Sequence, residues 1–282
     1  MDTPITDPEC IHKLLEERIL ASVRTPGRYI GGEQNIVRKD PAEVEVSFAL
    51  LFPDVYDLGM SHLGYQILYA ILNRLDWAAA ERAYAVWPDM QEKMREHRIP
   101  LYALESFRPV REFDVVGFSL QYEMLYTNVL AMLELAGIPL LSEQRTDEDP
   151  IVIAGGPGAC APEPMADFVD LFFPGDGEEV IVEFGELVRD AQESGQNREE
   201  TILRAARELE GAYAPAYYEP VYNEDGTVKA LRPTRDGLPE RVTARKVPDL
   251  ELAHFPTDLI VPFVETVHDR VSLEIMRGCT RG

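Results

Sequence analysis

The chain has 282 residues, of which 45% are hydrophobic, and a formal net charge of −23. This length suffices for one large or two ordinary globular domains. The charge repels a phosphate backbone and an anionic bilayer, so we expect neither direct nucleic-acid binding nor membrane association. The cysteines are few and far apart, and the amino terminus lacks a secretory pattern, which together favour a cytoplasmic protein.

The amino-terminal region, residues 1–39, is predicted to be a helix followed by a loop. Apolar residues between Pro8 and about Val23 recur at the spacing of one helical face, which indicates an amphipathic helix. Residues 28–33 read Arg-Tyr-Ile-Gly-Gly-Glu, and their paired glycines interrupt regular structure.

Residues 40–195 alternate between strand and helix patterns. Buried-type strands are predicted over 44–52, 82–87, 113–120, 150–154 and 168–173, with helices over 62–75, 89–97, 124–136 and 179–193. Parallel neighbours need a crossover element between them, and helices of this length supply it. The pattern therefore predicts an α/β fold: a Rossmann-like, doubly wound, mostly parallel sheet.

The remaining segments are predicted to form a connector and one last strand. Residues 196–265 contain a helix over 198–209 and a small β connector with short strands over 214–218 and 228–231. The turn sequence Asn-Glu-Asp-Gly at 223–226 separates these strands. Residues 266–282 begin a further unit, in which alternating apolar residues over 271–275 predict a strand.

Candidate ligand-binding residues follow the ends of the predicted strands. In an open parallel sheet, ligands gather beyond the carboxyl ends of the strands, and glycines there let a ligand approach the backbone. The residues that we expect to bind a cofactor are Tyr56, Gly59, Ser119, Leu120, Gln121, Gly155, Gly156, Pro157, Gly175 and Gly177.

The final residues, 277–282, read Arg-Gly-Cys-Thr-Arg-Gly and place a thiol between two cations. Neighbouring cations lower the pKa of a thiol and favour the thiolate, which is the form that binds metals. Cys279 is therefore a candidate metal ligand, although one cysteine does not hold a cluster.

The strand followed by Arg-Gly-Cys-Thr-Arg-Gly resembles the start of a radical S-adenosylmethionine (SAM) barrel, whose usual signature is C-x-x-x-C-x-x-C. The resemblance makes Cys279 the first of three ligands to a 4Fe–4S cluster, with the other two absent from this sequence. It implies an amino-terminal portion that ends inside the cluster-binding motif, with residues 266–282 as the first strand of a truncated barrel. In the full-length protein it implies a 4Fe–4S cluster and SAM as cofactors.

Residues 40–195 resemble the cobalamin-binding domain that precedes the barrel in many radical SAM enzymes. Ser119 and the pair Gly155-Gly156 stand where that family makes polar and glycine contacts, so cobalamin is a candidate cofactor. Residues 28–33 resemble the segment that precedes this domain in one such family. Some cobalamin domains carry Asp-x-His-x-x-Gly, but the spacing around His62 differs, and we expect His62 to pack or cap a helix start. Cys160 is expected to be a small buried residue.

These observations favour the amino-terminal, cofactor-binding portion of a radical SAM enzyme, with small-molecule cofactors as partners and an unknown substrate. This portion by itself is not expected to show cluster-dependent activity. One alternative is a Rossmann-like structural or partner-binding module that has lost cobalamin. A weaker alternative is a methylthiotransferase-like RNA modifier, whose own amino-terminal domain would need more cluster cysteines than Cys10 and Cys160 supply.

Overall fold

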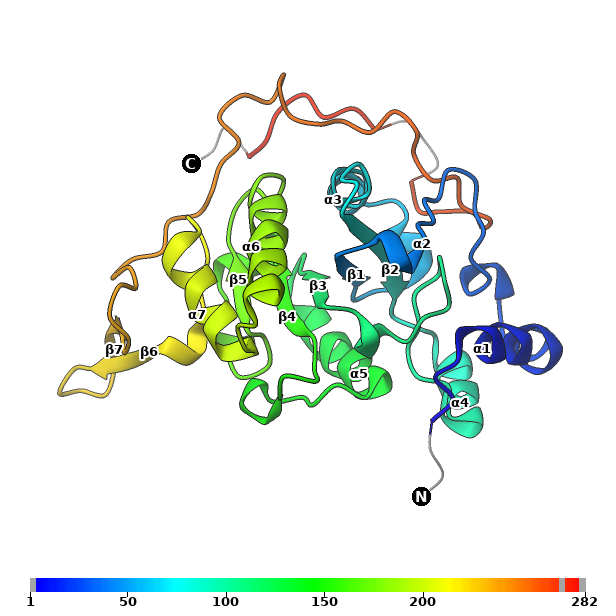
Figure 1. The fold of residues 1–282 in the computed structure, drawn as a ribbon, viewed down its shortest axis with the longest axis horizontal. Helices are drawn as coiled ribbons and strands as arrows, with labels where there is room; N and C mark the ends of the chain where they lie inside the picture. Colours follow the sequence, from blue (N-terminus) through cyan, green and yellow to red (C-terminus); the bar gives the residue numbers. More distant parts are fainter. Residues whose placement is uncertain (1–3, 269–271, 279–282) are drawn as a thin grey trace.

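A parallel sheet forms the centre of the structure (Figure 1). The computed structural model describes residues 4–268 and 272–278, and within them five strands lie in the order β2-β1-β3-β4-β5. The strands are β1 (Val46–Phe52), β2 (Ala78–Tyr84), β3 (Val115–Ser119), β4 (Ile151–Gly155) and β5 (Leu171–Phe173). Each neighbouring pair in this order is parallel, which confirms the predicted α/β sheet.

Helices cover both faces of this sheet, as a doubly wound fold requires. They are α1 (Pro8–Leu14), α2 (Tyr56–Gly59), α3 (Leu63–Asn73), α4 (Pro88–His97), α5 (Tyr126–Ala136), α6 (Val180–Ser194) and α7 (Arg198–Glu208). α3 and α6 contact each other on one face, and α4 and α5 lie on the other (Figure 1). Within the described ranges no helix combines the length and apolar character needed to cross a bilayer.

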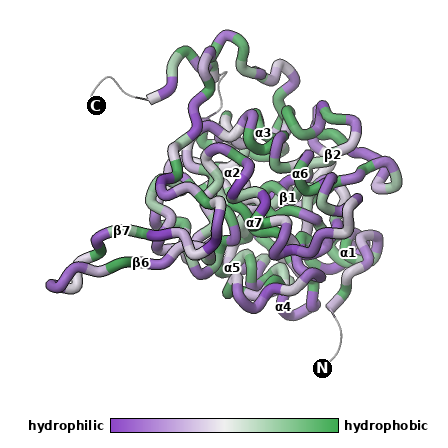
Figure 2. Tube along the Cα trace, turned by 60° about the vertical axis from the view of Figure 1, so that its left-hand side comes forward, coloured by the Kyte–Doolittle hydropathy of each residue, from purple (hydrophilic) through white to green (hydrophobic). Residues whose placement is uncertain are grey.

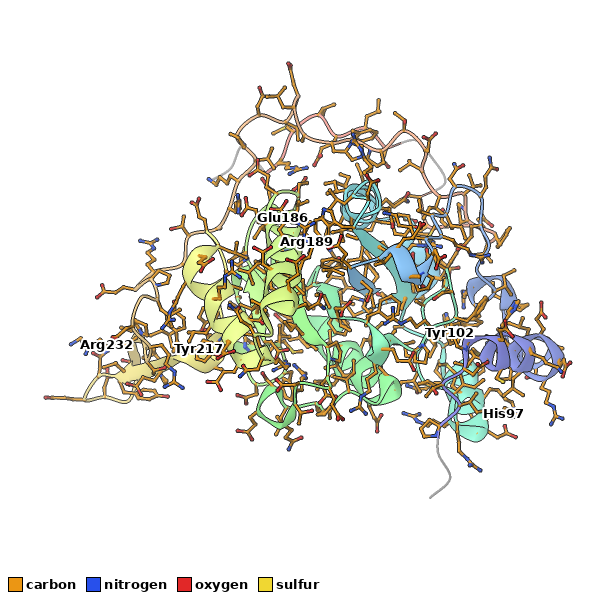
Figure 3. All side chains as sticks on the ribbon, in the orientation of Figure 1. His97, Tyr102, Glu186, Arg189, Tyr217 and Arg232 are labelled. Atoms are coloured by element: carbon orange, nitrogen blue, oxygen red, sulfur yellow. The ribbon has the colours of Figure 1, made fainter. Side chains whose placement is uncertain are left out.

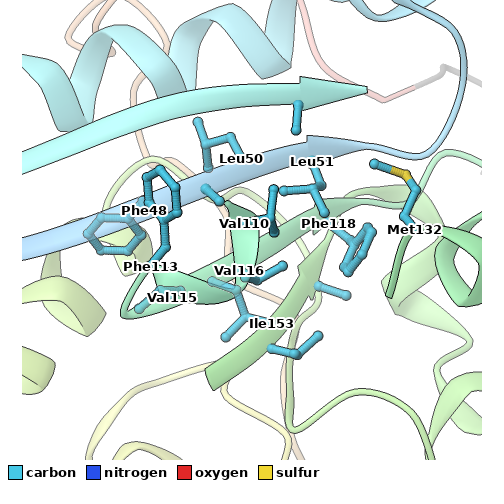
Figure 4. Packing of buried hydrophobic residues seen from close by; sticks show 14 of the residues in the cluster. Phe48, Leu50, Leu51, Val110, Phe113, Val115, Val116, Phe118, Met132 and Ile153 are labelled. Carbon is cyan, nitrogen blue, oxygen red and sulfur yellow. The ribbon is translucent and has the colours of Figure 1, made fainter. Parts of the chain in front are cut away.

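The core is built around β1, in which all seven residues are buried. A strand that lies between two parallel neighbours and beneath helices on both faces has no wet side, so its sequence is continuously apolar rather than alternating. Phe48, Leu50 and Leu51 pack here against side chains from β3 and β4 (Figure 4). The hydropathy colouring shows the same arrangement, with hydrophobic segments gathered inside (Figure 2).

Several elements differ from their predicted bounds. β2 begins at Ala78, four residues before the predicted start, because pairing with β1 recruits alanines that have little strand preference of their own. The predicted helix over 8–23 continues past α1 as a wider π turn over Leu15–Ile19 and a 3₁₀ turn over Leu20–Ser22. α2 lies between the predicted strand over 44–52 and the predicted helix over 62–75, where no regular element is expected.

The predicted strand over 271–275 is wrong for its described part, residues 272–275, which have no regular structure. A strand is stabilised by hydrogen bonds to a neighbouring strand, and this segment pairs with none in the described structure. Leu273 and Ile275 are consequently exposed.

The predicted β connector is present as an antiparallel hairpin of β6 (Tyr218–Tyr222) and β7 (Val228–Pro233). Its first strand was predicted too early, over 214–218, because Pro215–Tyr217 form a 3₁₀ turn before β6. It extends away from the sheet domain (Figures 1 and 2). Its turn contains Gly226 at a φ of +82°, a conformation that glycine adopts without steric cost.

A buried cluster of ion pairs joins the amino-terminal segment to the edge strand β2. Arg82 donates from Nη2 to Glu33 Oε2 at 3.0 Å and from Nε to Glu105 Oε1 at 2.5 Å. Each of the three side chains is only 1% exposed. Glu105 also accepts from the Arg82 backbone N–H at 2.7 Å. Tyr56 donates its hydroxyl to Glu33 at 2.8 Å. The free edge of β2 is thus closed by residues from two distant parts of the chain.

Replacing Arg82 with methionine is expected to destabilise the fold by about 3–5 kcal/mol, because two carboxylates remain buried without their cation. Arg95→Met is the matched control, since Arg95 makes an exposed ion pair with Glu134 and should lose less than about 1 kcal/mol. Urea unfolding of both variants measures the difference. Equal losses of unfolding free energy would show that the buried cluster stabilises the fold no more than an exposed ion pair does.

Glu81 lies on the same edge strand and accepts hydrogen bonds from the Ser106 backbone N–H at 3.1 Å and from its hydroxyl at 2.5 Å. Burial raises the pKa of Glu81 to about 7, because loss of water disfavours the charged carboxylate more than these donors favour it.

The raised pKa of Glu81 predicts a stability that falls as pH increases from its ordinary pKa of 4.5 to about 7. In this window the folded state holds a proton that the unfolded state has released, so raising the pH favours unfolding. Glu81→Gln should therefore gain stability relative to wild type between about pH 5 and about pH 8, as followed by urea unfolding at each pH. A pH-independent difference would contradict the assignment.

Candidate functional site

The order of the strands creates an opening at the carboxyl edge of the sheet. β1 and β3 are neighbours, but the chain leaves β1 towards β2 and leaves β3 towards β4, so their following loops part in opposite directions. Ligands in doubly wound folds bind at this kind of switch point. Here a cavity of about 220 Å³ lies between the sheet, α3 and α6, and we call it the switch-point pocket.

The walls of the switch-point pocket are mostly apolar, and on the side of the sheet glycines leave the backbone uncovered. Leu68 of α3 and Ile181 of α6 line the pocket, together with Gly117 in the middle of β3 and Gly155 at the end of β4. A Cβ on Gly117 would lie 3.4 Å from Ile153 and 3.6 Å from Leu50. Glycine inside a strand commonly marks a close approach by another group, and here it leaves space above the sheet.

The loops after β3 and β4 are locked together at the rim of the pocket. The Leu120 N–H donates to the Gly155 carbonyl at 2.8 Å, and the Leu120 carbonyl accepts from the Gly158 N–H at 2.9 Å. Gly156 has a φ of +93°, and a Cβ there would lie 2.6 Å from the Leu120 carbonyl oxygen. Only glycine fits this conformation and this contact, so the rim is rigid backbone.

His62 lies at the start of α3 and lines the pocket. Its Nδ1 accepts from the Tyr65 backbone N–H at 3.3 Å, which makes it the cap of this helix, as the sequence predicted. Burial lowers the pKa of His62, opposed by a hydrogen bond with Gln121. The neutral ring with an accepting Nδ1 carries its proton on Nε2.

Three acidic residues and one arginine form a charged part of the pocket lining. Asp176 and Glu178 follow β5, and Glu274 and Arg277 come from the carboxyl-terminal segment. Arg277 forms ion pairs with all three carboxylates.

A larger groove of about 880 Å³ lies on the outer side of α3 and α6, between them and residues 245–254. It shares Glu178 with the switch-point pocket but does not reach the sheet edge. We take the smaller cavity as the candidate site because the loops of three strands converge on it.

Seven of the ten predicted cofactor-binding residues line the switch-point pocket: Ser119, Gln121, Gly155, Gly156, Pro157, Gly175 and Gly177. Leu120 is fully buried beneath the rim, where its backbone holds the β4 loop. Tyr56 and Gly59 lie outside the pocket, since Tyr56 donates to Glu33 and Gly59 packs against the Tyr84 ring. Cys279 lies outside the described residues.

Sequence analysis missed several residues of this site. The glycine inside the apolar run of β3, Gly117, was a signal that a strand interior approaches another group. Glu274 and Arg277 carried no such signal, because only the fold brings them to the β5 loop. Cys160 was expected to be buried, but it is exposed on the short helical turn over Pro157–Cys160 that continues the glycine loop. Among the described residues, no group of three histidine, cysteine or acidic side chains is arranged to hold a metal ion.

The profile of the family described as radical SAM proteins, N-terminal, matches residues 64–215, more than half of the chain. The chain belongs to this family. The matched residues of this radical SAM N-terminal region run from α3 to just beyond α7 and contain most of the switch-point pocket.

Two further comparisons give more distant likenesses to this radical SAM N-terminal region. An uncharacterised protein of Methanocaldococcus jannaschii is 26% identical over 133 residues, which cover 46% of this chain and 24% of that protein. The chain thus matches about a quarter of the length of this relative. A solved structure of the radical S-adenosylmethionine methyltransferase TsrM from Kitasatospora setae, with tryptophan and a SAM analogue bound, is 13% identical with a TM-score of 0.37. That alignment covers 64% of this chain and 29% of TsrM.

The rigid rim predicts an unequal response to alanine at two glycines with positive φ. Gly156→Ala should cost more than about 2 kcal/mol, because its Cβ must displace the Leu120 carbonyl in addition to straining the backbone. Gly195→Ala should cost about 1 kcal/mol, since no atom lies within 4 Å of its Cβ position. Guanidinium unfolding distinguishes the two, and equal costs would argue against a locked rim.

Proposed function

We propose that this chain is the cofactor-binding portion of a radical SAM enzyme and that the switch-point pocket binds part of cobalamin. The observation that supports this most strongly is the convergence of the β3, β4 and β5 loops on the part of the pocket between α3 and α6 that Gly117 and Gly155 line. We call this part the slot. Such a slot accepts a flat group that approaches the backbone closely.

The residues present fit one end of cobalamin better than the whole molecule. A cavity of about 220 Å³ is far too small for the corrin macrocycle but suits the flat aromatic base of the nucleotide tail. Gly117 and Gly155 leave the sheet side open, while Leu68 and Ile181 provide apolar contact. Ser119 and Gln121 offer a hydroxyl and an amide at the rim for the polar parts of the tail.

His62 is not expected to be a cobalt ligand in this arrangement. Its Nδ1 is engaged in capping α3, and Nε2 carries the ring proton, so neither nitrogen presents a free lone pair. The role of His62 is therefore to fix the start of α3 beside the slot. When bound, the cofactor would supply cobalt–carbon chemistry, and this chain would bind it, orient it and keep water from the inserted end.

Iron–sulfur chemistry is proposed for the whole radical SAM enzyme and not for this portion alone. Reductive cleavage of SAM at a 4Fe–4S cluster needs three thiolates, of which Cys279 would be the first. The described residues contain no such set of ligands, so we derive no catalytic step for this portion. The cytoplasmic location and the absence of nucleic-acid binding stay predictions.

A second candidate is a structural module of the same family without cobalamin. The observation that favours it is that the carboxylates lining the pocket, Asp176, Glu178 and Glu274, are already paired with Arg277 and need no ligand to balance their charge. An ultraviolet–visible spectrum of protein purified from cobalamin-supplied cells separates the two candidates, because only the first predicts corrin absorption bands.

Titration of the purified chain with hydroxocobalamin should give a dissociation constant in the micromolar range or tighter. Gly117→Val should weaken binding at least tenfold, because its side chain fills the slot from below while valine suits a strand. Gly137→Ala is the control, since it adds a Cβ where no atom lies within 4 Å, at the end of α5. Equal affinity of Gly117→Val and wild type would place the cofactor elsewhere.

A further inference from the structure

The carboxyl-terminal segment, residues 272–278, forms part of the wall of the switch-point pocket. Glu274 and Arg277 line the cavity together with the loop that follows β5. Figure 1 shows this segment, in orange to red, passing over the ends of α6 and α3. The pocket is therefore completed by residues about one hundred positions away from the β5 loop in the chain.

Arg277 makes the ionic contacts that hold this segment to the β5 loop. Its Nη1 lies 3.3 Å from Asp176, its Nη2 pairs with Glu178, and its Nε donates to Glu274 at 2.8 Å. Its side chain is 24% exposed, so these contacts are only partly screened by water. Hydrogen bonds to Glu274 and Glu178 raise the pKa of Arg277 further, and the residue stays a cation at every accessible pH.

The surrounding charges make the position of this guanidinium specific. Three carboxylates of the pocket lining pair with one cation, so without Arg277 they would repel one another. Asp176 is fixed independently, because its Oδ2 accepts from the Val247 backbone N–H at 2.7 Å. Arginine suits such a site better than lysine, since its planar fork reaches several carboxylate oxygens at once.

We propose that Arg277 is a positioning residue: it holds residues 272–278, which precede Cys279 in the sequence, against the wall of the switch-point pocket. A molecule in the pocket and residues 272–278 then stabilise each other's position. This coupling is reciprocal, so a ligand that contacts the wall also orders the segment. The coupling to a bound ligand depends on the proposed function, whereas the docking of residues 272–278 by Arg277 does not.

Limited trypsin digestion tests the docking without any cofactor, because cleavage after Arg277 requires its side chain to leave the three carboxylates. In the double variant Asp176→Asn/Glu178→Gln of the full chain, trypsin should cleave the Arg277–Gly278 bond about tenfold faster than in wild type, as followed by mass spectrometry. The residues on either side of this bond are the same in both proteins, so its intrinsic cleavage rate is unchanged. Glu179→Gln/Glu183→Gln is the matched control: it also removes two charges, but these two carboxylates pair with Arg245 rather than Arg277.

Cobalamin affinity tests the coupling. Arg277→Gln should bind hydroxocobalamin about tenfold more weakly than wild type, and Arg277→Lys should lie between them. Arg232→Gln, on the protruding hairpin, should bind as wild type does (Figure 3). Because Arg277→Gln leaves the core intact, thermal unfolding should not differ from that of Arg232→Gln.

The outcomes are distinguishable. Unchanged cleavage in the double variant would overturn the docking, and with it the proposal. Faster cleavage with undiminished cobalamin affinity in Arg277→Gln would overturn the coupling. If wild type binds no cobalamin, the proposed function and the coupling both fail, and the cleavage result alone then decides whether Arg277 holds the segment.

Discussion

The structure depends on a single constraint, the reversal of strand order beside β1 in an all-parallel sheet. Since β1 pairs with β2 on one side and β3 on the other, helices must cover both faces, and every residue of β1 is excluded from water. The same reversal sends the loops after β1 and β3 in opposite directions at the carboxyl edge. A crevice therefore remains between these loops. The apolar core and the switch-point pocket therefore have one origin.

The outer strands of the sheet, β2 and β5, have their free edges covered by residues from distant parts of the chain. On β2, the Leu104 N–H donates to the Arg82 carbonyl at 2.8 Å, and Glu33 and Glu105 neutralise the Arg82 side chain. On β5, Phe172 forms a bridge with Tyr213. These contacts leave the carboxyl ends of the strands as the place where the backbone is accessible to a ligand.

The amino ends of the strands are closed in a different way. Ser47 donates from its backbone and its hydroxyl to Asp114, at 2.8 and 2.6 Å, which ties β1 to the start of β3. Asp170 accepts from the Val152 N–H at 2.7 Å and from Arg145 at 2.9 Å, and it also pairs with Arg198. Two hydrogen-bonded carboxylates, the half-buried Asp114 and the buried Asp170, fasten this end, whereas the opposite end keeps glycines and a cavity.

The sequence predicted the sheet well because apolar runs and helix periodicity are local signals. It placed β2 too late because Ala78 to Ala80 become strand only through pairing with β1. The glycine loops after β4 and β5 were recognised from their composition, and they line the pocket. Tyr56 was proposed from its position after β1, but its hydroxyl turns inward to Glu33, which no local pattern reveals.

The role of Arg277 was equally hidden from sequence. It was predicted as a cation beside a thiol, yet in the structure its side chain neutralises three carboxylates at the pocket. Only contacts between segments far apart in the chain define this site, and composition and spacing do not encode them. The predicted domain bounds and the role of Cys279 stay predictions.

The central claim is that the switch-point pocket takes the nucleotide end of cobalamin, and it is tested most directly by comparing cobalamin with cobinamide, which lacks the nucleotide base. Calorimetric titration of the full chain with each corrinoid measures the contribution of that end alone. The structure predicts that cobalamin binds at least tenfold more tightly than cobinamide. Equal affinities, or no binding of either corrinoid, would contradict the claim.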